Sequence, residues 1–166
     1  EIGDAALALK GIFNEVTIAP EYQESVRHSL DFPPPRILAG QALREYASSA
    51  IDLSDGLISD LGHICLASKV GANIVLEDLP ISNALRDTIG MEEAFDIALV
   101  GGDDYELLFT VSEDNRVGME TALANSGNTI TCIGQLNGSE KITTTLDNKP
   151  ISINAKSFEH FSQRSE

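Results

Sequence analysis

Two acidic segments could carry metal-dependent phosphate chemistry, and the first spans residues 50–57, AIDLSDGL. An apolar run ends there, Asp52, Ser54 and Asp55 follow closely, and a helical pattern starts at once. Free N–H groups and the dipole at a helix N-terminus favour an anion such as phosphate. Carboxylates at the same place would repel a bare phosphate, but Mg²⁺ between them would bind both groups through oxygen.

The alternative for this segment is an ordinary helix N-cap, in which Ser54 or Asp55 accepts the first helical N–H groups. Such caps are common, and the local pattern alone favours this alternative. The cap leaves Asp52 unexplained, because that carboxylate stands at the end of an apolar strand pattern.

The second segment spans residues 100–109, VGGDDYELLF. Gly101 and Gly102 allow a tight turn before the paired carboxylates of Asp103 and Asp104, and a strand pattern follows directly. Adjacent like charges are costly to hold together unless a cation lies nearby. A solvated turn is the alternative for this segment. In the tail, Phe158 and His160 would by composition alone be a packing contact and a surface residue.

The elements that must position these segments mix helices with strands. Apolar spacing predicts helices at 4–9, 22–30, 37–46, 57–69, 83–89, 92–98 and 113–125, and strands at 48–53, 72–76, 105–111, 130–135, 141–146 and 150–153. Three prolines at 33–35 end the second helix, and Asn137-Gly138 predicts a turn joining two of the late strands. The order predicts an α+β domain with helices packed on a mixed sheet.

Composition narrows the function classes. The chain has 166 residues, 42% of them hydrophobic, with a formal net charge of −15. This acidity argues against nucleic-acid binding, because no basic stripe could displace counterions from phosphates. No apolar run reaches the roughly 20 residues of a membrane span, and no signal peptide is evident. The distant Cys65 and Cys132 predict neither a disulfide framework nor a zinc site, and favour a reducing cytoplasm.

The helical pattern begins almost at residue 1, without a preceding strand or an initiator methionine. We expect one domain over 1–166, cut from a longer chain.

Together these segments resemble the thiamine-monophosphate kinase family of the aminoimidazole-ribonucleotide-synthetase superfamily. The resemblance spans nearly the whole chain. The similar segments are IGDAAL at 2–7, Pro35-Arg36, IDLSDGL at 51–57 with Asp60-Leu61, GGDDYEL at 101–107 and FEHF at 158–161. The first acidic segment is shared across the superfamily, and its pairing with the second and with the tail is more specific. The implied fold is a three-layer α/β/α domain with a mixed sheet, of the superfamily's C-terminal type.

The resemblance also implies site roles. Asp52 and Asp55 are expected to bind Mg²⁺, Ser54 to contact the ATP phosphates, and Asp103 and Phe158 to contact thiamine monophosphate. Apart from the resemblance, Asp60→Asn, one helical turn beyond Asp55, is expected to have little effect if Asp60 is merely solvated. No general base is evident. An N-terminal domain absent from this chain would supply further Mg²⁺ ligands, most of the nucleotide pocket and a homodimer interface.

This sequence departs from the family pattern at two places. The family usually has Gly-Glu-Asp where residues 102–104 are Gly-Asp-Asp, which shortens the carboxylate of Asp103. The family's closing motif usually has Gly where Ser157 stands. The alternatives are another ATP-using superfamily enzyme (aminoimidazole-ribonucleotide synthetase, selenophosphate synthetase or a hydrogenase-maturation protein) and a non-catalytic acidic binding module.

Overall fold

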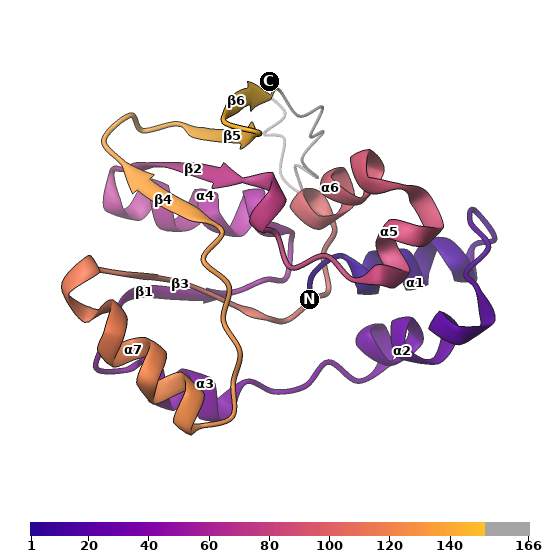
Figure 1. Ribbon diagram of the computed structural model, residues 1–166, viewed down its shortest axis with the longest axis horizontal. Helices are drawn as coiled ribbons and strands as arrows, with labels where there is room; N and C mark the ends of the chain where they lie inside the picture. Colours follow the sequence, from indigo (N-terminus) through magenta and orange to yellow (C-terminus); the bar gives the residue numbers. More distant parts are fainter. Residues whose placement is uncertain (152–166) are drawn as a thin grey trace, which may run out of the picture.

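The computed structural model describes residues 1–151, whose helices and strands alternate along the chain (Figure 1). The α helices are α1 (Asp4–Ile12), α2 (Pro20–Asp31), α3 (Ile37–Leu43), α4 (Leu57–Ser68), α5 (Asn83–Ile89), α6 (Met91–Val100) and α7 (Glu113–Asn125). The strands are β1 (Ala47–Asp52), β2 (Gly71–Val75), β3 (Leu107–Val111), β4 (Gly134–Asn137), β5 (Ile142–Leu146) and β6 (Lys149–Ile151). No helix within 1–151 is long and apolar enough to cross a membrane.

The six strands form two sheets. One is the antiparallel pair of β1 and β3, and the other has the order β4-β2-β5-β6. In the second sheet β2 pairs parallel with β5 and antiparallel with β4, so this sheet is mixed. The predicted α+β class with a mixed sheet is therefore confirmed.

Helices cover both faces of the β1–β3 pair (Figure 1). Leu107 and Phe109 pack on the side of α3 and α7, whose buried core includes Leu43 and Leu123. Leu108, one residue out of phase, packs on the opposite side against the core that contains α4. The pair is thus the middle of a three-layer α/β/α arrangement, and the mixed sheet covers the far side of α4.

A third core lies among the helices at the other end of the molecule. Leu7, Val26 and Leu85 are buried there, and they join α1, α2 and α5. Ser82 caps α5 by accepting the Leu85 N–H at 2.9 Å. This helical cluster holds the N-terminal segment of the chain beside α5 and α6 (Figure 1).

The predicted hairpin through Asn137-Gly138 is wrong. The strand predicted at 130–135 begins only at Gly134, and β4 and β5 flank β2 on opposite sides instead of pairing with each other. The tight hairpin joins β5 to β6, where Leu146 faces Lys149. Asp147 and Asn148 between them have φ of 51° and 60°, the left-handed pair that a type I′ turn requires.

Candidate active-site loops

The two acidic segments meet through their backbones. The N–H of Asp103 donates to the carbonyl oxygen of Ser54 at 3.0 Å, and the N–H of Tyr105 donates to that of Leu53 at 2.8 Å. Leu53 also donates its own N–H to the carbonyl of Glu106 at 2.9 Å. These bonds extend the β1–β3 ladder beyond Asp52. Residues 52–56 and residues 101–106 therefore form one hydrogen-bonded unit. After the roles predicted for them, the two segments are named the metal loop and the substrate loop.

Two glycines permit this close approach. A Cβ at Gly102 would lie 2.5 Å from the carbonyl oxygen of Ser54. A Cβ at Gly56, where φ is +101°, would lie 2.8 Å from the carbonyl group of Val100. A side chain at Gly102 would push the two loops apart, and one at Gly56 would push the metal loop away from the end of α6.

The structure places the predicted metal ligands at the surface. Asp52 is the last residue of β1, Asp55 lies in the loop before α4, and both are exposed. Ser54 between them is half-buried. Gly56 is the N-cap residue of α4, and no side chain caps that position. The N-cap alternative for Ser54 and Asp55 is therefore not what the structure shows, and their side chains are not used as caps.

Asp60 differs from its expected role as a solvated residue. Only 2% of Asp60 is exposed. Its Oδ2 accepts the N–H of Ser54 at 2.9 Å and the N–H of Asp55 at 3.1 Å. The sequence contains a signal for this burial, because Asp60 lies three residues after Leu57 and four before Ile64, on the apolar face of the helix.

The substrate loop contains two residues in the left-handed region. Asp103 has φ of 68° and Tyr105 has φ of 49°. Such conformations are uncommon for non-glycine residues and persist where surrounding bonds enforce them. Here the enforcing bonds are the backbone contacts to Ser54 and Leu53. The side chain of Asp103 is half-buried, beside exposed Tyr105.

The side chain of Asp104, unlike that of Asp103, is hydrogen-bonded to the N-terminal segment of the chain. Both of its carboxylate oxygens accept the N–H of Gly3 at 2.9 Å. Burial raises the pKa of Asp104 to about 7, and the nearby carboxylate of Asp4 adds to that rise, while the Gly3 N–H opposes it. Burial also raises the pKa of Asp4, whose carboxylate accepts the hydroxyl of Ser82. Of the paired carboxylates, only Asp103 is thus left for a ligand.

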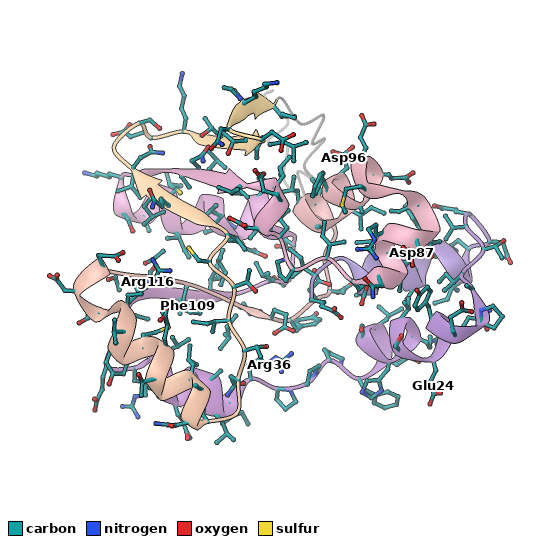
Figure 2. The ribbon with its side chains drawn as sticks, in the orientation of Figure 1. Glu24, Arg36, Asp87, Asp96, Phe109 and Arg116 are labelled. Carbon is teal, nitrogen blue, oxygen red and sulfur yellow. The ribbon has the colours of Figure 1, made fainter. Side chains whose placement is uncertain are left out.

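An ion pair supports the substrate loop from the side of α3. Arg36 donates from Nε and Nη2 to the two carboxylate oxygens of Glu106, at 2.7 and 2.6 Å. The side chains are 36% and 23% exposed, and the pair raises the pKa of Arg36. Arg36 lies on the segment that leads into α3 (Figure 2). The sequence patterns did not predict a contact between Arg36 and Glu106, because 70 residues separate the two positions.

A complete metal site is not formed by residues 1–151, where no three His, Cys, Asp or Glu side chains are grouped to hold an ion. Asp52 and Asp55 are oxygen donors of the kind that Mg²⁺ prefers, and it commonly uses one or two carboxylates together with substrate phosphates. A shared site for these two residues therefore stays a prediction. Phe158 lies outside the described residues.

Known proteins resemble this chain over nearly all of it. The thiamine-monophosphate kinase of Escherichia coli (strain K12) is 46% identical over 162 residues, covering 96% of this chain and 50% of that protein. The crystal structure of thiamine-monophosphate kinase from Stenotrophomonas maltophilia K279a is 38% identical with a TM-score of 0.79, covering 90% of this chain and 48% of that one. The structure of AaThiL complexed with AMPPCP and TMP is 28% identical with a TM-score of 0.74, covering 96% and 48%.

The chain spans about half the length of the curated relatives that it matches. The resemblance to thiamine-monophosphate kinases inferred from the sequence motifs is confirmed by these matches. The family model described as AIR synthase related protein, C-terminal domain, matches residues 11–147. The chain therefore belongs to the family of AIR synthase related protein C-terminal domains.

Proposed function

We propose that the complete protein carrying this chain phosphorylates thiamine monophosphate with ATP, giving thiamine diphosphate and ADP. The observation that carries the proposal is the backbone union of the metal loop with the substrate loop, through Asp103 and Ser54. A kinase must hold its phosphoryl donor and its acceptor side by side, and this union would do so. The kinase relatives and the AMPPCP and TMP complex of AaThiL support the same reaction.

In this reaction a phosphate oxygen of thiamine monophosphate attacks the γ-phosphorus of ATP. One P–O bond forms to that oxygen, and the bond to the β–γ bridging oxygen breaks, so that the electron pair leaves with ADP. Catalysis of phosphoryl transfer rests mainly on positioning and on charge stabilisation. A phosphate oxygen is already an anionic nucleophile, so the proposal assigns no general base.

Charge neutralisation is the main requirement, because both substrates are anions and the chain itself carries a formal net charge of −15. We assign Asp52 and Asp55 as Mg²⁺ ligands, on the basis of their exposure and their place beside the start of α4. Mg²⁺ would screen the phosphates from one another and from these carboxylates. Two carboxylates from this chain are too few for several ions, so further ligands would come from the N-terminal half of the complete protein.

The remaining contacts follow from the loops. The hydroxyl of Ser54 is assigned to the ATP phosphates, because the described hydrogen bonds of this residue use only its backbone. Asp103 is assigned to thiamine monophosphate, since its backbone is fixed against Ser54 and its carboxylate accepts a long, exposed hydrogen bond from the hydroxyl of Tyr105, at 3.5 Å. Phe158 is assigned to the thiamine rings from the sequence resemblance alone.

The complete protein is proposed to be a homodimer that assembles through its N-terminal half. We place it in the cytoplasm, a proposal supported by Cys65 and Cys132, which are both free thiols. The 166-residue chain alone should form no thiamine diphosphate, because the N-terminal ligands are missing.

The test is a comparison of acceptors with the purified complete protein. ATP and Mg²⁺ are supplied with thiamine monophosphate, with selenide, or with the amidine precursor that aminoimidazole-ribonucleotide synthetase cyclises, and the products are separated chromatographically. The proposal expects thiamine diphosphate with the first acceptor, at roughly 1 s⁻¹ or more. Turnover only with another acceptor would identify a different superfamily enzyme, and no turnover with any of them would favour a binding module.

A further inference from the structure

The peptide group between Ser54 and Asp55 is held from both sides. Its N–H, which belongs to Asp55, donates to the carboxylate of Asp60 at 3.1 Å. Its carbonyl oxygen, which belongs to Ser54, accepts the N–H of Asp103 at 3.0 Å. A peptide group is planar and rigid. This single group therefore connects a buried carboxylate on α4 with the backbone of the substrate loop.

Asp60 holds this peptide group from the side of α4. It lies in the first turn of α4, it is 2% exposed, and its Oδ2 also accepts the N–H of Ser54 at 2.9 Å. Low polarity around an acceptor strengthens the hydrogen bonds that it accepts. On the side of α4, the position of the metal loop is thus set by one side chain, which binds the backbone of Ser54 and Asp55 and leaves the side chains of both residues available.

The opposite side of the peptide group has no room to move. A Cβ at Gly102 would already lie 2.5 Å from the carbonyl oxygen of Ser54, so the substrate loop is in van der Waals contact with it. If the peptide group rotates, the hydrogen bond to Asp103 must lengthen or residues 102–103 must follow. Displacement of the metal loop would therefore displace the substrate loop.

We infer that Asp60 is a positioning residue that couples the nucleotide side of the active site to the acceptor side through the Ser54–Asp55 peptide group. The inference rests on the proposed kinase function for its kinetic consequence, and on the hydrogen bonds alone for its structural one. Loss of Asp60 weakens the use of Mg²⁺–ATP and of thiamine monophosphate together, although the buried carboxylate of Asp60 is bonded to the backbone of Ser54 and Asp55.

The kinetic test uses the complete protein with Asp60→Ala and Asp60→Asn. Asp60→Ala is expected to raise the half-saturating Mg²⁺–ATP concentration and the KM for thiamine monophosphate by about ten-fold each, the scale seen for groups that orient metal ligands. Asp60→Asn keeps one acceptor oxygen, so it is expected to shift both constants in the same direction by less. The matched control is Thr144→Val, because Thr144 is also buried and its hydroxyl donates to a backbone carbonyl, that of Ile151, at 2.7 Å on β5.

The control should lower the melting temperature and leave both constants unchanged. If Asp60→Ala does the same, its role is purely structural and the inference is overturned. A shift in only one of the two constants would overturn the coupling.

A second readout separates this inference from the kinase proposal. Amide hydrogen exchange of the complete protein is compared between the wild type and Asp60→Ala, without substrates. Faster exchange is expected at Ser54, at Asp55 and also at Asp103, whose N–H is the far end of the connection. Unchanged exchange at Asp103 overturns the coupling. A protein that forms no thiamine diphosphate but shows all three changes would refute the proposed function and keep the role of Asp60.

Discussion

The carboxylate of Asp104 holds the backbone N–H of Gly3 with both of its oxygens, across 101 residues of sequence. This contact joins the substrate loop to the segment that begins α1. Because the carboxylate of Asp104 is largely withdrawn from water and lies near Asp4, the bond comes with an electrostatic cost that depends on pH.

We predict that stability of the 166-residue chain contains a contribution from Asp104 that falls as pH rises from about 4 to about 7. The folded pKa, about 7, is above the unfolded value of 3.8, so the folded state binds the extra proton in this window and loses stability as the proton is removed. At about 1.4 kcal/mol per pKa unit the whole change is on the order of 4 kcal/mol.

Asp104→Asn should remove this contribution. The difference in unfolding free energy between this variant and the wild type should be near zero at pH 4, rise through the window and level off once the pH has passed the folded pKa of about 7. Urea unfolding at each pH measures it. Glu24→Gln is the control, because Glu24 is exposed on α2 and points away from the molecule (Figure 2). A difference for Asp104→Asn that is flat across the window would mean that Asp104 is ionised throughout.

Arg36→Lys should destabilise the chain by about 1 kcal/mol, because a lysine ammonium cannot reproduce the two-point contact of Arg36 with Glu106. Arg27→Lys is the matched control: Arg27 pairs with Asp31 within α2, where 56% of the arginine side chain is exposed. That change should stay within about 0.5 kcal/mol. Equal decreases in the free energy of unfolding for Arg36→Lys and Arg27→Lys would show that the Arg36–Glu106 pair stabilises the chain no more than the exposed pair does.

Gly102→Ala should cost about 1–3 kcal/mol of stability, since its Cβ would overlap the carbonyl oxygen of Ser54. Gly62→Ala, in α4, has no atom within 4 Å of the added Cβ and should gain up to about 1 kcal/mol from helix propensity. Thermal unfolding of both variants measures the difference. A harmless Gly102→Ala would contradict the close union of the two loops.

Phe158→Ala in the complete enzyme should raise KM for thiamine monophosphate several-fold, because ring stacking contributes on the order of 1 kcal/mol beyond buried area. KM for ATP and the melting temperature should stay nearly the same. Asp103→Asn should resemble it on the acceptor side. A lower melting temperature with an unchanged KM would assign Phe158 to packing instead.

Local patterns predicted much of this fold. The helix at 83–89 and the helix at 113–125 have the predicted bounds, and β1, at Ala47–Asp52, is one residue earlier at each end than the strand expected at 48–53. Apolar periodicity and capping residues act over a few positions, so the sequence displays them directly. The strand order was not predicted, because β2 lies between β4 and β5 and its partners are chosen by contacts distant in sequence.

The candidate site was likewise predicted only in part. The residue types at 52–55 and 101–104 indicated metal and phosphate chemistry, and the family resemblance supplied their roles. The hydrogen bond between Asp103 and Ser54 and the buried position of Asp60 depend on tertiary packing. Asp60 was expected at the surface because its residue type is charged. Its place between Leu57 and Ile64, on the apolar face of α4, was the local signal for burial.

The most direct test of the account is transfer of labelled γ-phosphate from ATP to thiamine monophosphate by the complete protein, measured across a Mg²⁺ titration for the wild type, Asp55→Asn and Glu24→Gln. An amide is a much poorer Mg²⁺ ligand than a carboxylate. The account predicts labelled thiamine diphosphate from the wild type and from Glu24→Gln at the same Mg²⁺ concentration, and a several-fold higher Mg²⁺ requirement for Asp55→Asn. No label in thiamine diphosphate, or an identical Mg²⁺ response of Asp55→Asn and Glu24→Gln, would contradict it.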